Sequence, residues 1–181
     1  MKFIPTSLEG SYIIEVEPFN DERGWFTRFY CKKEFSQIGY NGEWKQSNHS
    51  TTYKKGTVRG MHFQKKPFQE IKLVKCISGL VYDVIIDLRK ESSSFLQWTG
   101  IELSEKNKRM IFIPQGFAHG FQCMEDNCEL IYQHSEFYTP EFEQGIRFND
   151  PMIDIHWPLP AIYISSKDSS YPLLDKNFKG V

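Results

Sequence analysis

The chain has 181 residues, a quarter of them charged, and its acidic and basic side chains nearly balance to a net charge of -1. This length suits one domain with a substantial core and is short for two. The near-neutral balance argues against a protein that binds nucleic acid by neutralising phosphates, and against a basic membrane-surface protein.

The four cysteines show neither CxxC spacing nor a dense disulfide pattern. We therefore expect reduced thiols. The first ten residues lack the long apolar run of a secretory signal, and no apolar segment approaches the length needed to span a membrane. Together these features predict a cytoplasmic protein.

The first predicted elements are a strand over residues 11–16 and an aromatic segment over residues 25–30, with a turn at residues 21–24 between them. Aromatic residues that follow a charged turn indicate the start of a strand. The alternative is a clamp for an aromatic, anionic ligand. Residues 32–38 are the only early segment with helical character.

From Gly42 onward the pattern becomes a series of short strands separated by turn-forming residues. The predicted strands are 44–50, 57–63, 71–78, 80–87, 98–103, 109–113, 120–124 and 128–134. About eight short strands with little helix indicate an all-β sandwich or barrel. Residues 81–87 are mostly apolar on both faces, which predicts a central strand there.

The last part of the chain, residues 148–181, is rich in proline. We expect it to pack against the barrel, with a helix near Pro172-Leu173-Leu174. No internal repeat or low-complexity linker divides the chain. Residues 1–181 are therefore predicted to form a single domain with an N-terminal strand arm and a C-terminal tail.

The segment Val58–Gln64 places an arginine, a glycine and a histidine in a β-like run. Simple alternation along a strand puts Arg59 and Met61 on one face and Gly60 and His62 on the other. A glycine beside an imidazole leaves space for a group to approach the ring. The alternative is a core histidine that donates to a backbone carbonyl.

Other histidines lie on different predicted strands and loops. His119 lies in a loop shaped by proline and glycine, and His49 lies in a polar segment. Histidines on separate strands of a small barrel can converge at its mouth, as a metal site or an acid–base site. The chain has no His-x-His and no other pair at metal-ligand spacing, so we expect no metal. Acid–base chemistry is favoured because imidazole titrates near neutral pH.

Two further residues allow both a structural and a chemical interpretation. Lys72 lies in an apolar strand, where its side chain either extends to the surface or points inward to stabilise an oxyanion. Tyr132 also lies in a predicted strand, where a tyrosine is either part of the core or a proton donor.

Several segments together resemble the dTDP-4-dehydrorhamnose 3,5-epimerase family. The most specific pair is RGMHFQ at residues 59–64 with IPQGFAHGF at residues 113–121. The resemblance extends in family order from about residue 12 to residue 175. The other matching segments are 21–24, 48–50, 72–74, 81–84, 87–90, 102–104, 107–109, 145–151 and 155–158.

This resemblance implies a cupin-type jelly roll that acts without a metal or organic cofactor. The implied reaction is epimerisation of a nucleotide-linked 4-keto-6-deoxyhexose at carbons 3 and 5, in deoxysugar biosynthesis. His62 is implied as the general base, Asp168 as its carboxylate partner, and Tyr132 as the general acid on the opposite sugar face. Lys72 and His119 would lie around the ketone and the sugar.

The resemblance also implies a homodimer and a set of substrate contacts. Tyr138 would stack on the nucleotide base. Arg23 and Phe26 would reach across to the neighbouring subunit's site. The remaining implied contacts to the nucleotide sugar are Gln46, Asn48, Arg59, Glu143 and Lys167. Because simple alternation puts Arg59 on the face away from His62, either the strand is bent or bulged there or Arg59 reaches the phosphate around the barrel rim.

The chain departs from the family pattern at several positions. Arg28 stands where a glutamate that contacts the nucleotide is common, and Ile71 replaces a small residue before Lys72. Gln115 replaces a glutamate, and Gln133-His134 replaces a pair that begins with lysine. These departures leave open the sugar, the nucleotide, and epimerisation at one carbon or two. A non-catalytic cupin that binds a sugar nucleotide is the alternative from another class.

Overall fold

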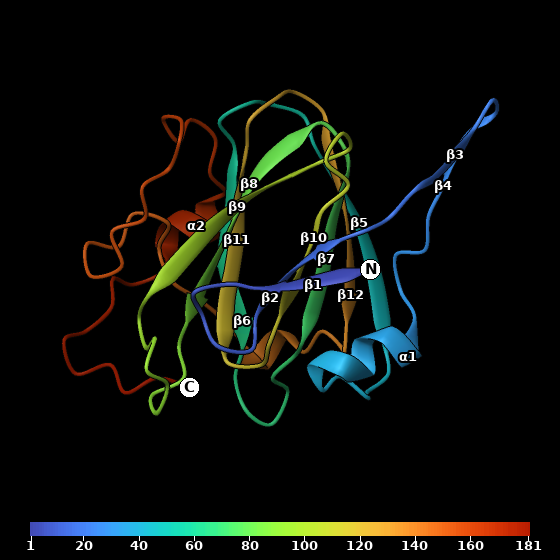
Figure 1. Cartoon of the computed structure of the whole chain (residues 1–181). Coiled ribbons are helices and arrows are strands. Elements are labelled where there is room, and N and C mark those ends of the chain that lie inside the picture. Colours follow the sequence, from blue (N-terminus) through green and yellow to red (C-terminus); the bar gives the residue numbers. More distant parts are fainter.

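The computed structural model describes all 181 residues. Two antiparallel β-sheets face each other, with short helices around them (Figure 1). The six-stranded sheet has the order β1 (Lys2–Pro5), β2 (Tyr12–Glu15), β10 (Met110–Ile113), β7 (Lys72–Ser78), β12 (Cys128–His134) and β5 (Gln46–Thr52). The five-stranded sheet has the order β13 (Glu143–Gly145), β6 (Val58–Gln64), β11 (Phe117–Cys123), β8 (Leu80–Asp87) and β9 (Trp98–Ser104). The predicted all-β, cupin-type jelly roll is confirmed.

The remaining elements lie outside the two sheets. Strands β3 (Phe19–Asp21) and β4 (Gly24–Phe26) form a hairpin that projects away from the body of the molecule (Figure 1). The helices are α1 (Lys32–Phe35), α2 (Ser166–Ser170) and the 3₁₀ turns η1 (Ser36–Ile38) and η2 (Pro140–Phe142). None of the helices is both long enough and apolar enough to cross a membrane.

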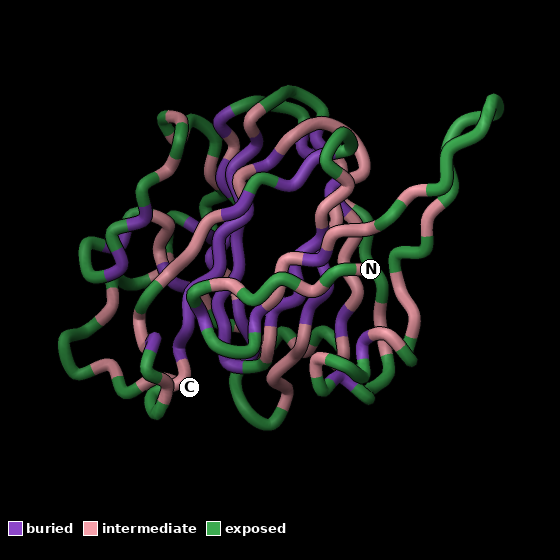
Figure 2. The backbone as a smooth tube through the Cα atoms, viewed as in Figure 1, coloured by how far each residue is buried: buried purple, intermediate pink, exposed green.

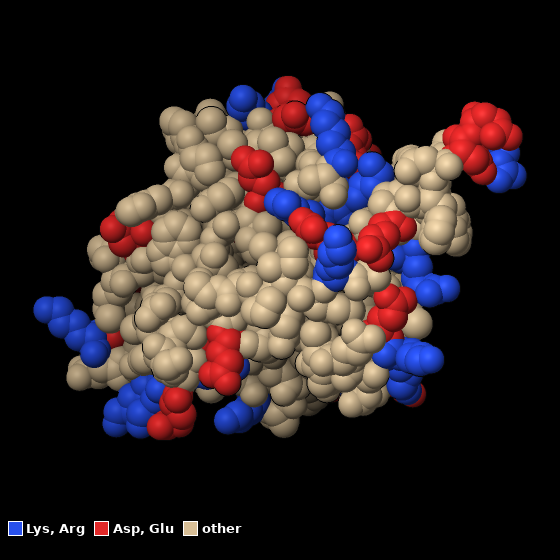
Figure 3. All heavy atoms as spheres, in the orientation of Figure 1, with Lys and Arg blue, Asp and Glu red and all other residues tan.

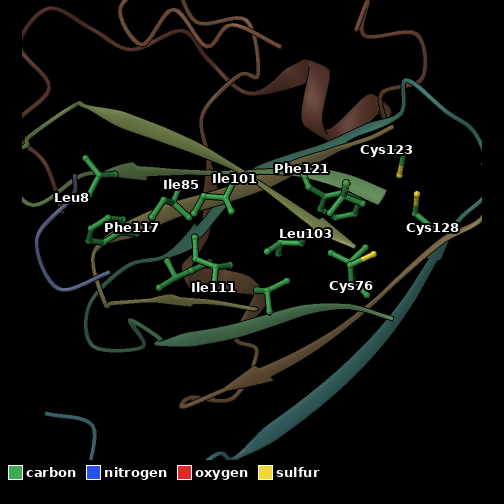
Figure 4. Packing of buried hydrophobic residues seen from close by; sticks show 14 residues of the cluster. Leu8, Cys76, Ile85, Ile101, Leu103, Ile111, Phe117, Phe121, Cys123 and Cys128 are labelled. Atoms are coloured by element: carbon green, nitrogen blue, oxygen red, sulfur yellow. The ribbon is translucent and has the colours of Figure 1, made fainter. Parts of the chain in front are cut away.

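The main core lies between the two sheets, where alternate residues of each strand point inward. Figure 4 shows this cluster, to which β8 contributes Val81 and Ile85, and β7 contributes Val74 and Cys76. Fully burying such a side chain contributes about 1.5–3 kcal/mol. Buried residues are concentrated in these central strands, whereas the hairpin and the outer loops are exposed (Figure 2).

The C-terminal tail covers the outer face of the five-stranded sheet. Val84 and Ile86 of β8 point to that face and pack with Ile153 and Ile155 of the tail. This explains why the sequence of β8 is apolar on both faces, and it confirms the prediction of a central strand. The predicted packing of the tail against the barrel is also confirmed.

The predicted helix near Pro172-Leu173-Leu174 is wrong, because the helix of the tail is α2. The Ser165 hydroxyl accepts a hydrogen bond from the Asp168 N–H and caps the start of α2. The helix ends before Tyr171, since a residue that precedes proline disfavours helical backbone angles.

Most predicted strands are present, with shifted ends. Strand β5 runs two residues beyond the predicted end at Ser50, and β11 begins at Phe117 rather than at Gly120. The short strands β1, β3 and β13 were not predicted. Each has three or four residues, too few for an alternating pattern to stand out.

Charged side chains of both signs are interspersed along the upper rim of the molecule and at the tip of the hairpin (Figure 3). This mixture fits the net charge of -1. The face shown carries no broad basic surface of the kind that binds nucleic acid through phosphates.

Candidate active site

A cavity of about 600 Å³ opens between the two sheets and is lined by residues of both. The predicted site residues that line it are Gln46, Asn48, Arg59, His62, Lys72, His119, Tyr132, Tyr138 and Glu143. Asp168 and Lys167 line an adjoining hollow, which shares Arg59 and His62 with the cavity. Residues distant in sequence therefore meet in one place, as the sequence predicts.

Strand β6 is irregular beside β11, and this corrects the simple alternation expected along it. His62 pairs with His119 and Arg59 pairs with Phe121, so three steps along β6 face only two along β11. Such a bulge adds a residue to one strand and turns the side chains that follow it. Arg59 and His62 consequently both line the cavity.

The sequence predicts that Gly60 leaves space for a ligand beside the imidazole. This prediction is wrong. A Cβ atom at Gly60 would lie 2.6 Å from the Cα of Gly120 and 2.7 Å from the carbonyl oxygen of His119. The missing side chain instead allows close approach of β6 and β11. The N–H of Gly60 donates to Asp168 across 3.2 Å.

His62 forms a pair with Asp168, whose Oδ1 lies 2.7 Å from Nε2 of the imidazole. Helix α2 and its cap at Ser165 hold Asp168, which is only 6% exposed, whereas His62 is 31% exposed toward the cavity. Burial alone would raise the pKa of Asp168, but the hydrogen bond and charge of His62, with smaller contributions from Gly60 and Ser165, together lower that pKa. An ionised Asp168 favours the hydrogen on Nε2, which leaves Nδ1 of His62 to act as a base.

A second pair joins His119, which lines the same cavity, to the buried Asp83: Nε2 of His119 is 3.0 Å and 2.9 Å from the two carboxyl oxygens of Asp83. Both side chains are buried. Burial raises the pKa of Asp83 in spite of the neighbouring His119 and Lys72. Asp83 was not predicted as a site residue, although an aspartate inside the apolar run of β8 is a signal for one.

Tyr132 lies on the opposite wall from His62, because β12 belongs to the six-stranded sheet and β6 to the five-stranded sheet. Its hydroxyl is 3.1 Å from that of Ser50, and its ring packs against that of His119 in a T-shaped arrangement, at 6.2 Å between centroids. Burial raises the pKa of Tyr132 well above its usual value. The phenol therefore keeps its proton at neutral pH and is available as a donor.

Lys72 points inward rather than to the surface, with its side chain 11% exposed. Its ammonium lies 3.2 Å from Glu70, and the other oxygen of Glu70 lies 2.6 Å from Nδ1 of His134. Burial alone would raise the pKa of Glu70, but the Lys72 ammonium and the hydrogen bond from His134 lower it to about 2. Neither Glu70 nor His134 was predicted as a site residue.

The outer part of the cavity combines an exposed aromatic ring with charged side chains. Tyr138 is 51% exposed, and its hydroxyl donates to Glu143 across 2.7 Å. Lys167 pairs with the same carboxylate. Arg59 is held by a 3.1 Å hydrogen bond to Thr52. A planar base and a phosphate chain match such a surface in shape and charge.

Arg23 and Phe26 are the predicted site residues that line neither the cavity nor the adjoining hollow of their own chain. Both lie on the β3–β4 hairpin (Figure 1). Arg23 is paired with Asp21, and Phe26 is 72% exposed.

A model of the dTDP-4-dehydrorhamnose 3,5-epimerase family matches residues 5–176. The chain belongs to this family. The dTDP-4-dehydrorhamnose 3,5-epimerase of Methanothermobacter thermautotrophicus is 43% identical over 179 residues, which cover 97% of this chain and 96% of that one. The resemblance found in the sequence, and with it the prediction of an isomerase, is confirmed.

Solved structures of a dTDP-4-dehydrorhamnose 3,5-epimerase and of a dTDP-6-deoxy-D-glucose-3,5-epimerase share the fold. The crystal structure of the Elizabethkingia anophelis enzyme has a TM-score of 0.93 at 39% identity and 98% coverage of both chains. The Legionella pneumophila enzyme, solved in complex with dTDP-4-keto-L-rhamnose, has a TM-score of 0.89 at 37% identity, with 94% of this chain and 90% of that one covered.

Proposed function

We propose that this protein epimerises dTDP-4-dehydro-6-deoxy-D-glucose at carbons 3 and 5 to give dTDP-4-dehydro-L-rhamnose. The observation that carries the proposal is the placement of His62 and Tyr132 on opposite sheets across one cavity. Inversion of a carbon centre needs a base on one face of the sugar and an acid on the other. In this proposal the sugar lies between these two walls.

The hydrogens on the two carbons beside a ketone are acidic, because the carbanion that remains is delocalised as an enolate. His62 takes the proton from carbon 5, and the electron pair moves onto the ketone oxygen. Lys72 stabilises the resulting oxyanion. Tyr132 then gives its proton to the opposite face of the same carbon.

The second inversion, at carbon 3, repeats these steps after the two side chains recover their starting protonation. His62 returns its proton to water, and Tyr132 regains one before the next transfer. The required acid, base and oxyanion stabiliser are all side chains of this chain. We therefore propose a reaction without metal or organic cofactor, and activity that persists in excess chelator is the corresponding check.

The nucleotide is proposed to occupy the outer part of the cavity. Tyr138 would stack on the thymine base. Arg59 and Lys167 would contact the diphosphate, which an arginine can bind through two parallel hydrogen bonds. Gln46, Asn48 and Glu143 would supply hydrogen bonds to the rest of the nucleotide sugar.

The decisive experiment incubates the protein with dTDP-4-keto-6-deoxyglucose in deuterated water and follows the sugar by NMR. Deuterium at both carbons 3 and 5, with the L-rhamno product, supports the proposal. Deuterium at carbon 3 alone would replace it with a 3-epimerase. If this and other nucleotide keto sugars bind without any exchange, the protein is a non-catalytic binder instead.

We further propose a homodimer in which the β3–β4 hairpin completes the partner's site. The support is that Arg23 and Phe26 lie exposed on a projecting hairpin, outside their own cavity. A mixture of the Arg23→Ala and His62→Gln variants tests this arrangement. If the hairpin acts across the dimer, exchange of subunits gives mixed dimers in which one of the two sites has both an intact His62 and an intact Arg23. About a quarter of all sites are then intact, and activity returns. Mixing without recovery would place the hairpin's action within one chain.

All four cysteines are free thiols. Free thiols of this kind persist in a reducing compartment. They support the proposal that the protein works in the cytoplasm.

A further inference from the structure

The Glu70 carboxylate joins two side chains of the cavity wall that lie on different strands. It lies just before β7, with its side chain 10% exposed. One of its oxygens is 3.2 Å from the ammonium of Lys72, and the other is 2.6 Å from Nδ1 of His134. Both oxygens of this buried carboxylate thus have a partner inside the site.

The connection continues from His134 along the wall toward the proposed nucleotide end. Nε2 of His134 lies 3.3 Å from the side-chain nitrogen of Asn48, whose oxygen accepts from Gln46 across 3.1 Å. The side-chain oxygen of Gln46 accepts in turn from the backbone N–H of Tyr138 across 3.1 Å. A chain that begins with the Lys72–Glu70 ion pair and continues through hydrogen bonds therefore links the Lys72 ammonium to the segment that holds Tyr138.

The donors and acceptors along this chain are mutually consistent. The amide nitrogen of Asn48 can only donate, so Nε2 of His134 accepts and the ring hydrogen lies on Nδ1. That hydrogen is the one donated to Glu70. The ring of His134 also stacks on that of Tyr132, at 6.1 Å between centroids and 24° between planes.

A lysine on a flexible four-carbon stem has many conformations, and its ammonium carries three hydrogens. The ion pair with Glu70, at 3.2 Å, selects a conformation in which the ammonium stays inside the cavity. The hydrogens of the ammonium that do not face Glu70 remain for a bound molecule. Without Glu70, the ammonium would lie in a largely buried position with its nearest counter-charge removed.

We propose that Glu70 and His134 are positioning residues for this reaction: Glu70 fixes the Lys72 ammonium against the ketone oxygen of the substrate, and His134 couples that placement to Asn48. The inference rests on the proposed function, because it assigns the ketone oxygen to Lys72. Neither residue transfers a proton to the sugar. Their effect is on the orientation of groups that touch it, and thus on the chemical step.

The first test is Glu70→Gln, which keeps the size of the side chain and removes its charge. A misplaced catalytic group slows the chemical step, and we expect kcat to fall about tenfold to a hundredfold. The affinity for dTDP alone, measured by calorimetry, is expected to change less than about twofold, because dTDP lacks the ketone. The matched control is Glu15→Gln, which removes a carboxylate paired with Arg109 outside the cavity and leaves kcat unchanged.

The second test asks whether Glu70 acts through Lys72. Slow deuterium exchange into the sugar is measured by NMR for Lys72→Gln with and without the Glu70→Gln change. If Glu70 works by orienting Lys72, the second change adds little once Lys72 is absent. Effects that multiply in the double variant would show independent roles and overturn the inference.

His134→Asn tests the other half of the connection. Asparagine can still donate to Glu70, but it is too short to reach Asn48, so we expect KM to rise while kcat falls less than in Glu70→Gln. An unchanged KM would remove His134 from the proposal.

The wild-type protein in the same assay separates the two levels of inference. Wild-type turnover with an unchanged kcat in Glu70→Gln overturns the role of Glu70 alone. A wild-type protein that binds the sugar nucleotide without turnover would overturn the proposed function and this inference with it.

Discussion

Two histidine–carboxylate pairs place their imidazoles in the wall of one cavity and differ mainly in their exposure. In both, Nε2 of the imidazole meets an aspartate, at 2.7 Å for His62 with Asp168 and at 2.9 Å for His119 with Asp83. The two imidazoles are also direct cross-strand neighbours on β6 and β11. Yet His62 is 31% exposed whereas His119 is 5% exposed.

This difference in burial changes what each pair can do. In the pair of His62, which is open to the cavity, the polar partners of Asp168, chiefly His62, outweigh burial and the pKa of Asp168 is lowered. In the closed pair burial prevails and the pKa of Asp83 is raised. The open imidazole can meet a C–H bond of a substrate, whereas the closed one supports the ring of Tyr132. Although the two pairs have similar geometry, His62 is therefore proposed as the base, and His119 is proposed as a structural part of the cavity wall.

The largest expected effect comes from replacing the two imidazoles in the same way. Glutamine keeps a donor toward the aspartate but cannot take up a proton. We expect His62→Gln to lower turnover and deuterium exchange by about 10³- to 10⁴-fold, because a general base is lost. For His119→Gln we expect about a tenfold loss. Steady-state rates with NMR exchange measure both, and equal losses would contradict the distinction between the pairs.

Tyr132→Phe separates proton removal from proton return. The change deletes the phenol that is proposed to protonate the opposite sugar face, while the open pair stays intact. Net inversion should fall by about a hundredfold or more, whereas exchange of the C–H hydrogens should fall far less. The same NMR assay reports both. Parallel loss of exchange and inversion would mean that Tyr132 also assists proton removal.

A smaller effect is expected from the carboxylates. Asp168→Asn removes the charge that favours the reactive form of His62, so kcat should fall roughly tenfold to a hundredfold with the fold retained. Asp83→Asn, at a fully buried position, should instead lower the free energy of unfolding by about 1–3 kcal/mol, with a smaller change in kcat. Kinetics and urea unfolding of both variants provide the check. A larger loss of kcat in Asp83→Asn would reverse the assignment of the pairs.

Much of the fold follows from local patterns in the sequence. The alternating and apolar runs predicted β8 and β12 with their observed ends, and turn residues predicted most breaks between strands. The bulge in β6 could not be derived in this way, because it depends on the fit between Gly60 and the backbone of Gly120 on another strand. For this reason Arg59 was expected on the face away from His62.

The site was predictable where family motifs mark it and not where long-range pairing creates it. The motifs identified His62, Tyr132 and Lys72, but the inward direction of Lys72 depends on Glu70 and on the opposite sheet. Glu70 and His134 are 64 positions apart, and each alone resembles an ordinary polar residue of a strand end. Their pairing is visible only once β7 and β12 lie side by side.

The smallest expected effect is in the pH dependence of stability, where the two pairs should differ in sign. The pKa of Asp168 is lowered in the folded state, so its stabilisation is complete above the ordinary value of 3.8 and is lost as the pH falls through the lowered value. The pKa of Asp83 is raised, so its effect occurs above 3.8, where stability decreases as the pH rises toward the raised value. The two effects therefore lie on opposite sides of that pH.

Urea unfolding of the wild type and of Asp168→Asn and Asp83→Asn across this pH range tests the sign of each effect. The advantage of the wild type over Asp168→Asn should shrink below about pH 4, by on the order of 1 kcal/mol. Relative to Asp83→Asn, the wild type should lose stability as the pH rises above about 4, because only the wild type must ionise a buried carboxyl. Curves that differ from the wild type in the same direction would show that burial does not shift the pKa values of the two aspartates in opposite directions.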